Sequence, residues 1–145
     1  MEYRNFGRQI VIRLDEGDEI VAEVMEVCRR EQVSAALVQG IGFTDEMKIR
    51  IYDRDSGTFL FHTVKGPMEI TSLTGNIARA DNGLYAHLHI MAADREMNVK
   101  GGHLISCRIA AAGEIVLNLC DGVFFRGASD DQRLGPISFE EKEDG

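Results

Sequence analysis

The stretch Leu84–Leu104, which reads LYAHLHIMAADREMNVKGGHL, constrains the fold more than any other part of the chain. In an extended strand, successive side chains point to opposite faces, so His87 and His89 share one face. The apolar residues that alternate with them occupy the other face and can lie on a core. The third histidine, His103, follows Gly101-Gly102. If the chain turns back before it, His103 lies on a second strand beside the first and the three imidazoles converge.

Three convergent imidazoles predict a metal site. Neutral imidazole binds Zn, Ni, Cu or Fe, and three imidazoles leave a fourth coordination position for water or a substrate. The pair His87 and His89 has little conformational freedom left to lose on a strand, and the double glycine before His103 allows close approach of the backbone. The alternative from spacing alone is a hydrogen-bonded polar face of a sheet that holds no metal.

Other polar residues near this stretch have both a functional and an ordinary interpretation. His62 is expected to be an ordinary strand residue rather than a fourth ligand. Glu69 is the candidate catalytic acid, with a capping or interface salt bridge as the alternative. Asp94 and Glu96 are expected to be solvated in the loop that joins the two strands. Lys100 is placed to meet an anion near the site, although a surface position is the default for lysine.

Length and composition predict one globular domain over residues 1–139, followed by an acidic, flexible tail over Glu140–Gly145. The 44% hydrophobic and 28% charged residues are ordinary for such a domain. No apolar run approaches the roughly 20 residues that span a bilayer, and the first residues lack the apolar segment of a secretory signal. The three cysteines are widely spaced and are expected to be buried thiols. Cytoplasmic residence is therefore the expectation.

The net charge of −8 argues against direct binding of nucleic acid. Contacts with phosphates dominate nucleic-acid affinity, so an acidic chain binds well only if its basic residues gather on one surface. The densest basic run in this sequence is the pair Arg29-Arg30. We therefore expect direct DNA binding to be weak.

The apolar patterns predict many strands and one early helix. From about Glu19 to Gln32 the apolar residues have the spacing of one helical face, with Asp18 as the N-cap and basic residues in the last turn. Glycines at the end of the 34–42 run predict an exit turn. The expected strands cover residues 10–14, 34–42, 47–52, 58–64, 68–78, 84–90, 104–111 and 114–119.

Turn residues predict how these strands connect. Asn82-Gly83 is the strongest tight-turn signal and leads into the histidine strand. Asp53–Gly57 predicts a hairpin with a longer loop, and Ala112-Gly113 predicts another hairpin. Gly66-Pro67 predicts a break. Mostly antiparallel strands with one early helix make an α+β fold.

The order of short motifs along the chain resembles the PPC domain, the "plants and prokaryotes conserved" domain. The motifs are the early helix followed by SAALVQGIG, then EITSLTGNIA, HLHI, GGHL and GEIVL, and they run from about Arg8 to Phe139. This resemblance implies an α+β fold with a mainly antiparallel sheet and one major early helix. It also implies a homotrimer as the usual assembly.

For function, the resemblance supports a metal more than it supports DNA. Prokaryotic members carry the same HxH and GGH elements, which His87, His89 and His103 match, and some are thought to hold a metal there, commonly zinc. Plant members generally lack these histidines. The DNA-binding label of the prokaryotic members rests largely on plant relatives, in which DNA contact is attributed to an AT-hook with an Arg-Gly-Arg-Pro core. This sequence has no such core.

Three functions remain open. The first, which we favour, is a trimeric domain that binds one divalent metal, with zinc expected, and has a regulatory or ligand-sensing role. The second is a metal-dependent hydrolase or lyase, in which zinc lowers the pKa of its bound water to about 7 and an acid such as Glu69 lies within reach of that water. The third is a DNA-associated protein that acts through partners. Enzyme activity stays open, because no residue pattern identifies a substrate.

Overall fold

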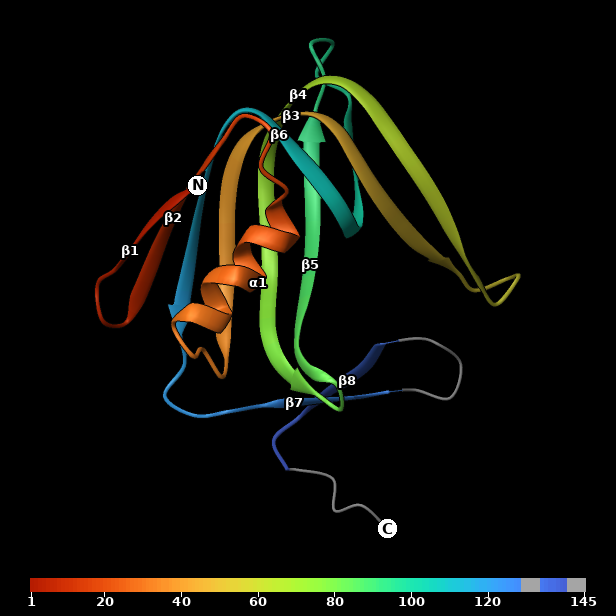
Figure 1. Ribbon diagram of the computed structural model, residues 1–145. Coiled ribbons are helices and arrows are strands. Elements are labelled where there is room, and N and C mark those ends of the chain that lie inside the picture. Colours follow the sequence, from red (N-terminus) through yellow and green to blue (C-terminus); the bar gives the residue numbers. More distant parts are fainter. Residues whose placement is uncertain (129–133, 141–145) are drawn as a thin grey trace.

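The structure is a computed structural model that describes residues 1–128 and 134–140. One helix lies across one face of long, curved strands, and the far ends of β3 and β4 project away from the rest of the molecule (Figure 1). Within the described residues, none of the helical structure is long and apolar enough to cross a membrane. The tail expected over Glu140–Gly145 falls, after Glu140, outside the described residues.

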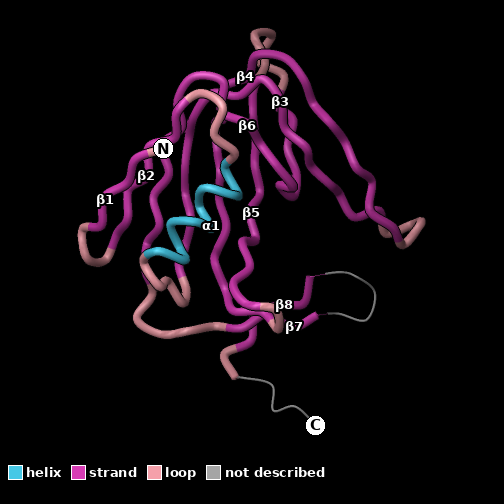
Figure 2. Tube along the Cα trace, in the orientation of Figure 1, coloured by secondary structure: helices cyan, strands magenta, loops and turns pink. Residues whose placement is uncertain are grey.

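Strands dominate the described part of the chain (Figure 2). The α+β fold with one early helix is confirmed, and all strand pairs except β4 with β7 are antiparallel. In chain order the elements are β1 (Glu2–Asn5), β2 (Gln9–Asp15), α1 (Ile20–Arg30), β3 (Ala36–Asp53), β4 (Thr58–Ala80), β5 (Gly83–Ala93), β6 (Val99–Leu119), β7 (Phe125–Ala128) and β8 (Leu134–Ser138).

The sheet closes around four of its strands. Its order is β1-β2-β6-β3-β4-β7-β8, and β5 lies off this path because it pairs with both β4 and β6. Since β3 also pairs with β4 and β6, the strands β3, β4, β5 and β6 form a ring of pairings. This closure removes free edges from the middle of the sheet and brings the start of β6 beside β5.

The core lies between α1 and the inward face of the sheet. Along β2, Ile10, Ile12 and Leu14 are fully buried and alternate with exposed residues, as the strand period requires. The apolar stripe of α1, represented by Val24 and Val27, packs against this face. Full burial of each such side chain stabilises the fold by about 1.5–3 kcal/mol.

The helix begins at Ile20, and its N-cap is Glu19 rather than the expected Asp18. The Glu19 carboxylate accepts hydrogen bonds from the backbone N–H of Ala22 at 2.7 Å and from that of Cys107 on β6 at 2.9 Å. The longer side chain thus caps the helix and ties it to the sheet at once. The Asp18 carboxylate instead accepts from the backbone N–H of Asp15.

Three expected interruptions are instead bends within long strands. The glycine-rich end of the 34–42 run does not turn, because β3 continues to Asp53. Gly66-Pro67 does not break β4, and Ala112-Gly113 does not reverse β6 into a hairpin. Both halves of β6 pair antiparallel with β3, which excludes a reversal between them. The expected turns at Asp53–Gly57 and Asn82-Gly83 are confirmed.

Close approach of two backbones explains the glycines of β3. A Cβ atom at Gly40 would lie 2.9 Å from the carbonyl oxygen of Glu114, and one at Gly42 would lie 2.8 Å from that of Ala112. Both distances are shorter than Cβ contacts in proteins, so any larger residue would push β3 and β6 apart. The pairing register shifts between Gly40 and Gly42, as in a β-bulge. Glycine, which predicted a turn at this position, instead allows a bend within a continuous strand.

Candidate metal centre

His87, His89 and His103 come together on one face of the sheet, and we refer to them as the histidine cluster. One ring nitrogen from each lies within 4.8 Å of the others. The ring centroids are 5.1 Å apart for His87 and His89, 5.1 Å for His87 and His103, and 5.6 Å for His89 and His103. The expected convergence of three imidazoles is therefore present in the structure.

Strand geometry places each member of the cluster. His87 and His89 lie on the outward face of β5, while Leu88 and Ile90 are buried in the core. His103 lies on β6 directly opposite His89 in the antiparallel register. Side chains directly opposite each other in such a pair stand on the same face of the sheet.

Glycines let the strands approach closely at the cluster. A Cβ atom at Gly101 on β6 would overlap the carbonyl oxygen of Ile90, which agrees with the expected role of the double glycine. A Cβ atom at Gly75 on β4 would overlap the carbonyl oxygen of His87, and this glycine was not singled out from the sequence. The signal that points to it is a lone glycine inside a strand pattern, which often marks close approach of another backbone.

The spacing of the donor atoms fits a metal ion. The Nε2 atoms of His87 and His89 lie 3.2 Å apart. In a tetrahedral site with Zn–N distances of about 2.05 Å, two ligand nitrogens lie about 3.3 Å apart. The same 3.2 Å also suits an N–H···N hydrogen bond, in which one imidazole donates to the other. A bound metal would take the place of that proton.

Two of the three rings are held in the neutral form that metal binding requires. Burial, then the charges of Arg126, His89 and Arg50, lowers the pKa of His87 from 6.5 to about 4. Burial, then Arg50 and the neighbouring charges, lowers the pKa of His103 from 6.5 to about 4. Both rings are therefore unprotonated at neutral pH.

Two arginines flank the cluster, and neither was anticipated from the sequence. Arg50 on β3 lies opposite His103 in the register, and its guanidinium stacks over the ring of Phe59 at 4.4 Å from the centroid. Arg126 on β7 donates from Nη2 to Asn76 Oδ1 at 3.1 Å, and Asn76 lies opposite His87. A single arginine in a sequence does not indicate a position beside the histidine cluster, because only the pairing of distant strands brings it to the cluster.

The remaining candidate residues lie outside the cluster. His62 is exposed on β4 opposite Ile49, and Glu69 is exposed on β4 opposite Ala93. Among the described residues, the metal-ligating group contains the three histidines and no acid. Lys100 is exposed at the start of β6. The loop acid Asp94 is less free than expected, because its carboxylate accepts hydrogen bonds from the N–H groups of Glu96 and Asn98.

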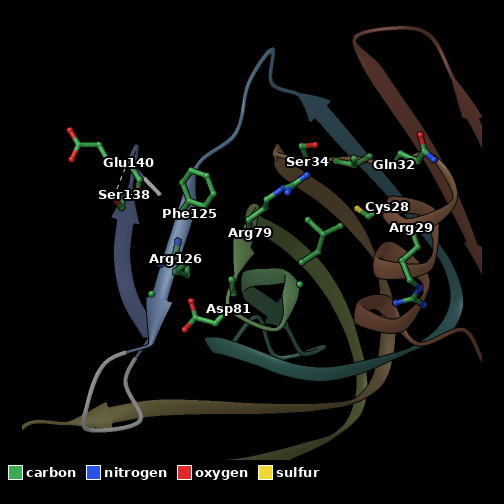
Figure 3. Close-up of a pocket in the computed structure, with 15 residues that line it drawn as sticks. Cys28, Arg29, Gln32, Ser34, Arg79, Asp81, Phe125, Arg126, Ser138 and Glu140 are labelled. Atoms are coloured by element: carbon green, nitrogen blue, oxygen red, sulfur yellow. Dashed lines mark hydrogen bonds between the residues drawn. The ribbon is translucent and has the colours of Figure 1, made fainter. Parts of the chain in front are cut away.

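Two hollows lie near these side chains. A groove of about 370 Å³ is lined by His89 together with Ser72, Thr74, Met91 and Val99. A larger hollow of about 790 Å³ lies between the end of α1, the turn after β4, and β7 with β8. Figure 3 shows Arg29, Arg79 and Arg126 around this second hollow together with Asp81 and Glu140. Only the first hollow has a histidine of the cluster in its wall.

A sequence model of the Plants and Prokaryotes Conserved (PCC) domain matches residues 1–121. The chain belongs to this family. The match includes all three histidines and both strands that carry them, and it confirms the resemblance drawn from the motifs. Among curated protein sequences, none matches this PCC-domain protein.

Solved structures with the same fold cover almost the whole PCC-domain protein. A candidate DNA-binding protein from Bacteroides thetaiotaomicron is 27% identical with a TM-score of 0.90, covering 97% of this chain and 98% of its own. A PPC protein from Pyrococcus horikoshii is 25% identical with a TM-score of 0.80, covering 98% and 96%. A metal-containing protein from Archaeoglobus fulgidus is 27% identical with a TM-score of 0.79, covering 93% and 95%.

Proposed function

We propose that this PCC-domain protein binds one divalent transition metal per chain through His87, His89 and His103, with zinc as the expected ion. The observation that carries this proposal is the convergence of three ring nitrogens within 4.8 Å on two paired strands. The pKa values of His87 and His103 support it, because both rings are neutral at pH 7. The metal-containing relative from Archaeoglobus fulgidus also supports it.

We assign the metal a ligand-sensing or regulatory role rather than hydrolysis. When bound, a divalent ion supplies a Lewis acid with an open coordination position, because the chain provides three ligands. A hydrolase also needs a general base within hydrogen-bond reach of the bound water. Glu69, the acid suggested for that task, lies opposite Ala93, which is four residues along β5 from His89, or about 13 Å at roughly 3.3 Å per residue. The geometry therefore supports binding of a ligand at the metal.

Elemental analysis of protein purified without a histidine tag tests the metal. We expect about one zinc or similar ion per chain at neutral pH. His89→Ala leaves two protein nitrogens and should lower zinc affinity by orders of magnitude, whereas His62→Ala is the matched control and should leave it unchanged. A parent protein without metal, or a His89→Ala variant that binds zinc as tightly as the parent, would refute the site.

We further propose that the protein assembles as a homotrimer. Leu37 and Ile41 are each 55% exposed on the outward face of β3, and Phe61 is 67% exposed on the projecting part of β4. Leu37 and Ile41 share one face of one strand, and exposed apolar residues that lie together in this way mark an interaction surface. Light scattering should give a trimer mass, and Ile41→Glu should lower that mass if this face is the interface. A monomer mass for the parent in dilute neutral buffer contradicts the proposal.

A DNA-associated role is the second candidate, because the Bacteroides thetaiotaomicron relative is named as a candidate DNA-binding protein. The net charge of −8 opposes direct contact with phosphates, so in this role the protein would act on DNA through partners. Fluorescence anisotropy with duplex DNA at about physiological salt tests this expectation. Non-specific binders show Kd values of roughly 10⁻⁴–10⁻⁶ M under such conditions, and tighter binding with a steep salt dependence would show direct recognition.

A further inference from the structure

Arg126 is a buried cation that forms no ion pair with a carboxylate among the described residues. Its side chain is 6% exposed, and among the described residues it is the one charged side chain classed as buried. Its Nη1 donates to the carbonyl oxygen of Gly135 at 2.8 Å and its Nη2 to Asn76, both of which are neutral acceptors. Its Nε has no acceptor. Burial of an unpaired charge is costly, which implies a counter-charge that the described residues do not supply.

Arg50 repeats this pattern on the other side of the histidine cluster. Its Nε is buried and also lacks an acceptor. Its guanidinium stacks on the face of the Phe59 ring, a contact that supplies no negative charge. Within the described part of the chain, neither Arg50 nor Arg126 forms an ion pair with a carboxylate.

The two arginines and the cluster occupy two neighbouring rows of residues across the sheet. The register places Arg50 beside His103 and His103 beside His89 in one row, and Asn76 beside His87 in the other, and Arg126 is bonded to Asn76. With a divalent ion on the three neutral histidines, these rows would gather the charges of the ion and of both guanidiniums in an otherwise acidic protein. Such a concentration of positive charge attracts an anion.

We propose that a small organic carboxylate binds at the metal centre, with Arg50 contacting it and the buried charge of Arg126 compensating it. This proposal rests on the proposed metal site. The guanidinium fork matches a carboxylate with two parallel hydrogen bonds. The groove that has His89 in its wall favours an organic acid over inorganic phosphate, because Met91 and Val99 give part of this wall an apolar character that suits a short carbon chain.

The test uses the full-length protein loaded with Co²⁺, whose visible absorption reports ligands that join the metal. The probe is lactate, with lactamide as its uncharged counterpart and inorganic phosphate as the competing anion. We expect lactate to change the absorption spectrum with a measurable midpoint concentration. Lactamide should have little effect, and phosphate should bind more weakly than lactate. Arg50→Met should raise the lactate midpoint by about tenfold or more, as expected for loss of a charge-assisted hydrogen bond. Arg126→Met should raise it by a smaller factor, because this variant removes a nearby positive charge but no contact with the ligand.

Controls separate this proposal from the metal site and from folding. Arg108→Met removes an exposed arginine of β6 that pairs with Asp45, so it matches the change in net charge and should leave the midpoint unchanged. Arg50→Lys keeps the charge without the fork and should fall between Arg50→Met and the parent. Circular dichroism and the cobalt content of each variant confirm that fold and metal are retained.

The outcomes are distinguishable. Protein that takes up no metal refutes the proposed function itself, and it also refutes the carboxylate site, which requires the metal. Protein that holds cobalt but does not respond to lactate, or whose Arg50→Met and Arg126→Met variants respond as the parent does, refutes the carboxylate site alone. In that case Arg126 serves to attach β8 to β4, through Gly135 and Asn76. Stronger binding of phosphate than of lactate refutes the choice of an organic acid.

Discussion

His103 on β6 stands directly opposite His89 on β5, so the sheet itself brings the third imidazole to the other two. The connection between these strands does not need to position a ligand. Its acid, Asp94, instead accepts backbone hydrogen bonds from Glu96 and Asn98 and shapes the turn. Because ladder hydrogen bonds fix two strands more firmly than a loop can, we expect the centre to be preorganised before a metal binds.

Zinc should therefore stabilise the fold. A ligand that binds only the native state stabilises it by about 2.7 kcal/mol at a free concentration of 100 times its Kd. In a domain of this size that corresponds to a rise in Tm of several degrees. Differential scanning fluorimetry with added zinc and then with a chelator measures the rise and its reversal. The same titration of His103→Ala should show no rise; an equal rise in that variant would place the ion elsewhere.

The metal-free protein should lose stability as the pH falls from about 6.5 to about 4. Folding lowers the pKa of His87 and of His103 from 6.5 to about 4, so in this interval the unfolded chain binds protons that the folded chain does not. The stability that this difference provides is present above pH 6.5 and is lost as the pH falls toward 4. Urea unfolding with a chelator at pH 7, 6 and 5 measures the loss.

Replacing the two rings provides the control for this pH dependence. Carboxylates with lowered pKa values, such as that of Glu31, also affect stability in acid, but only below their usual titration range. In the double variant His87→Gln, His103→Gln, the free energy of unfolding should therefore change little between pH 7 and 5. The loss of stability at lower pH should remain. An unchanged slope in the double variant would mean that other groups cause it.

Local pattern was enough to predict the elements that follow a regular period. The alternation in β5 correctly put the histidines on one face and Leu88 and Ile90 on the other, and the helical spacing located α1 within two residues at each end. Both Ile70 and Leu73 are buried although simple alternation puts them on opposite faces. A bulge between Ile70 and Ser72 shifts the period, and no local residue pattern announces it.

The parts of the site that the sequence did not reveal depend on long-range pairing. Arg50 reaches His103 because β3 pairs with β6, and Arg126 reaches the cluster through a hydrogen bond to Asn76. An isolated arginine in a strand is ordinary, so only the assembled sheet shows its role. The HxH spacing, in contrast, is local, and it placed two of the three histidines on one face without the fold.

Gly75→Ala should disturb the cluster from the neighbouring strand. The added methyl group would overlap the carbonyl oxygen of His87, so β4 and β5 would have to separate at the site. We expect a loss of about 1–3 kcal/mol in the free energy of unfolding, as for other overpacked positions, and weaker zinc binding. Urea unfolding and a zinc titration measure the two effects.

Gly122→Ala separates close approach from backbone strain. Its φ of +142° resembles the +158° of Gly75, but a Cβ atom there would meet nothing within 4 Å. The control should therefore show the cost of the backbone conformation alone and leave zinc affinity unchanged. Equal losses in both variants would show that the contact with His87 is unimportant.

Glu19→Ala should destabilise the protein more than Asp18→Ala. Glu19 caps α1 through the N–H of Ala22 and also satisfies the part-buried N–H of Cys107 on β6. Asp18 instead accepts from the N–H of Asp15 in an exposed turn and pairs with the N-terminal ammonium group at 3.0 Å. Loss of an N-cap costs about 1 kcal/mol and an unsatisfied buried donor about 1–3 kcal/mol, so we expect about 2 kcal/mol or more for Glu19→Ala. Glu19→Gln keeps one acceptor oxygen and should lie between Glu19→Ala and the parent. Urea unfolding at neutral pH ranks the three variants by their free energy of unfolding. A larger loss of stability for Asp18→Ala than for Glu19→Ala would indicate that Asp18, the residue favoured by the sequence pattern, is the N-cap.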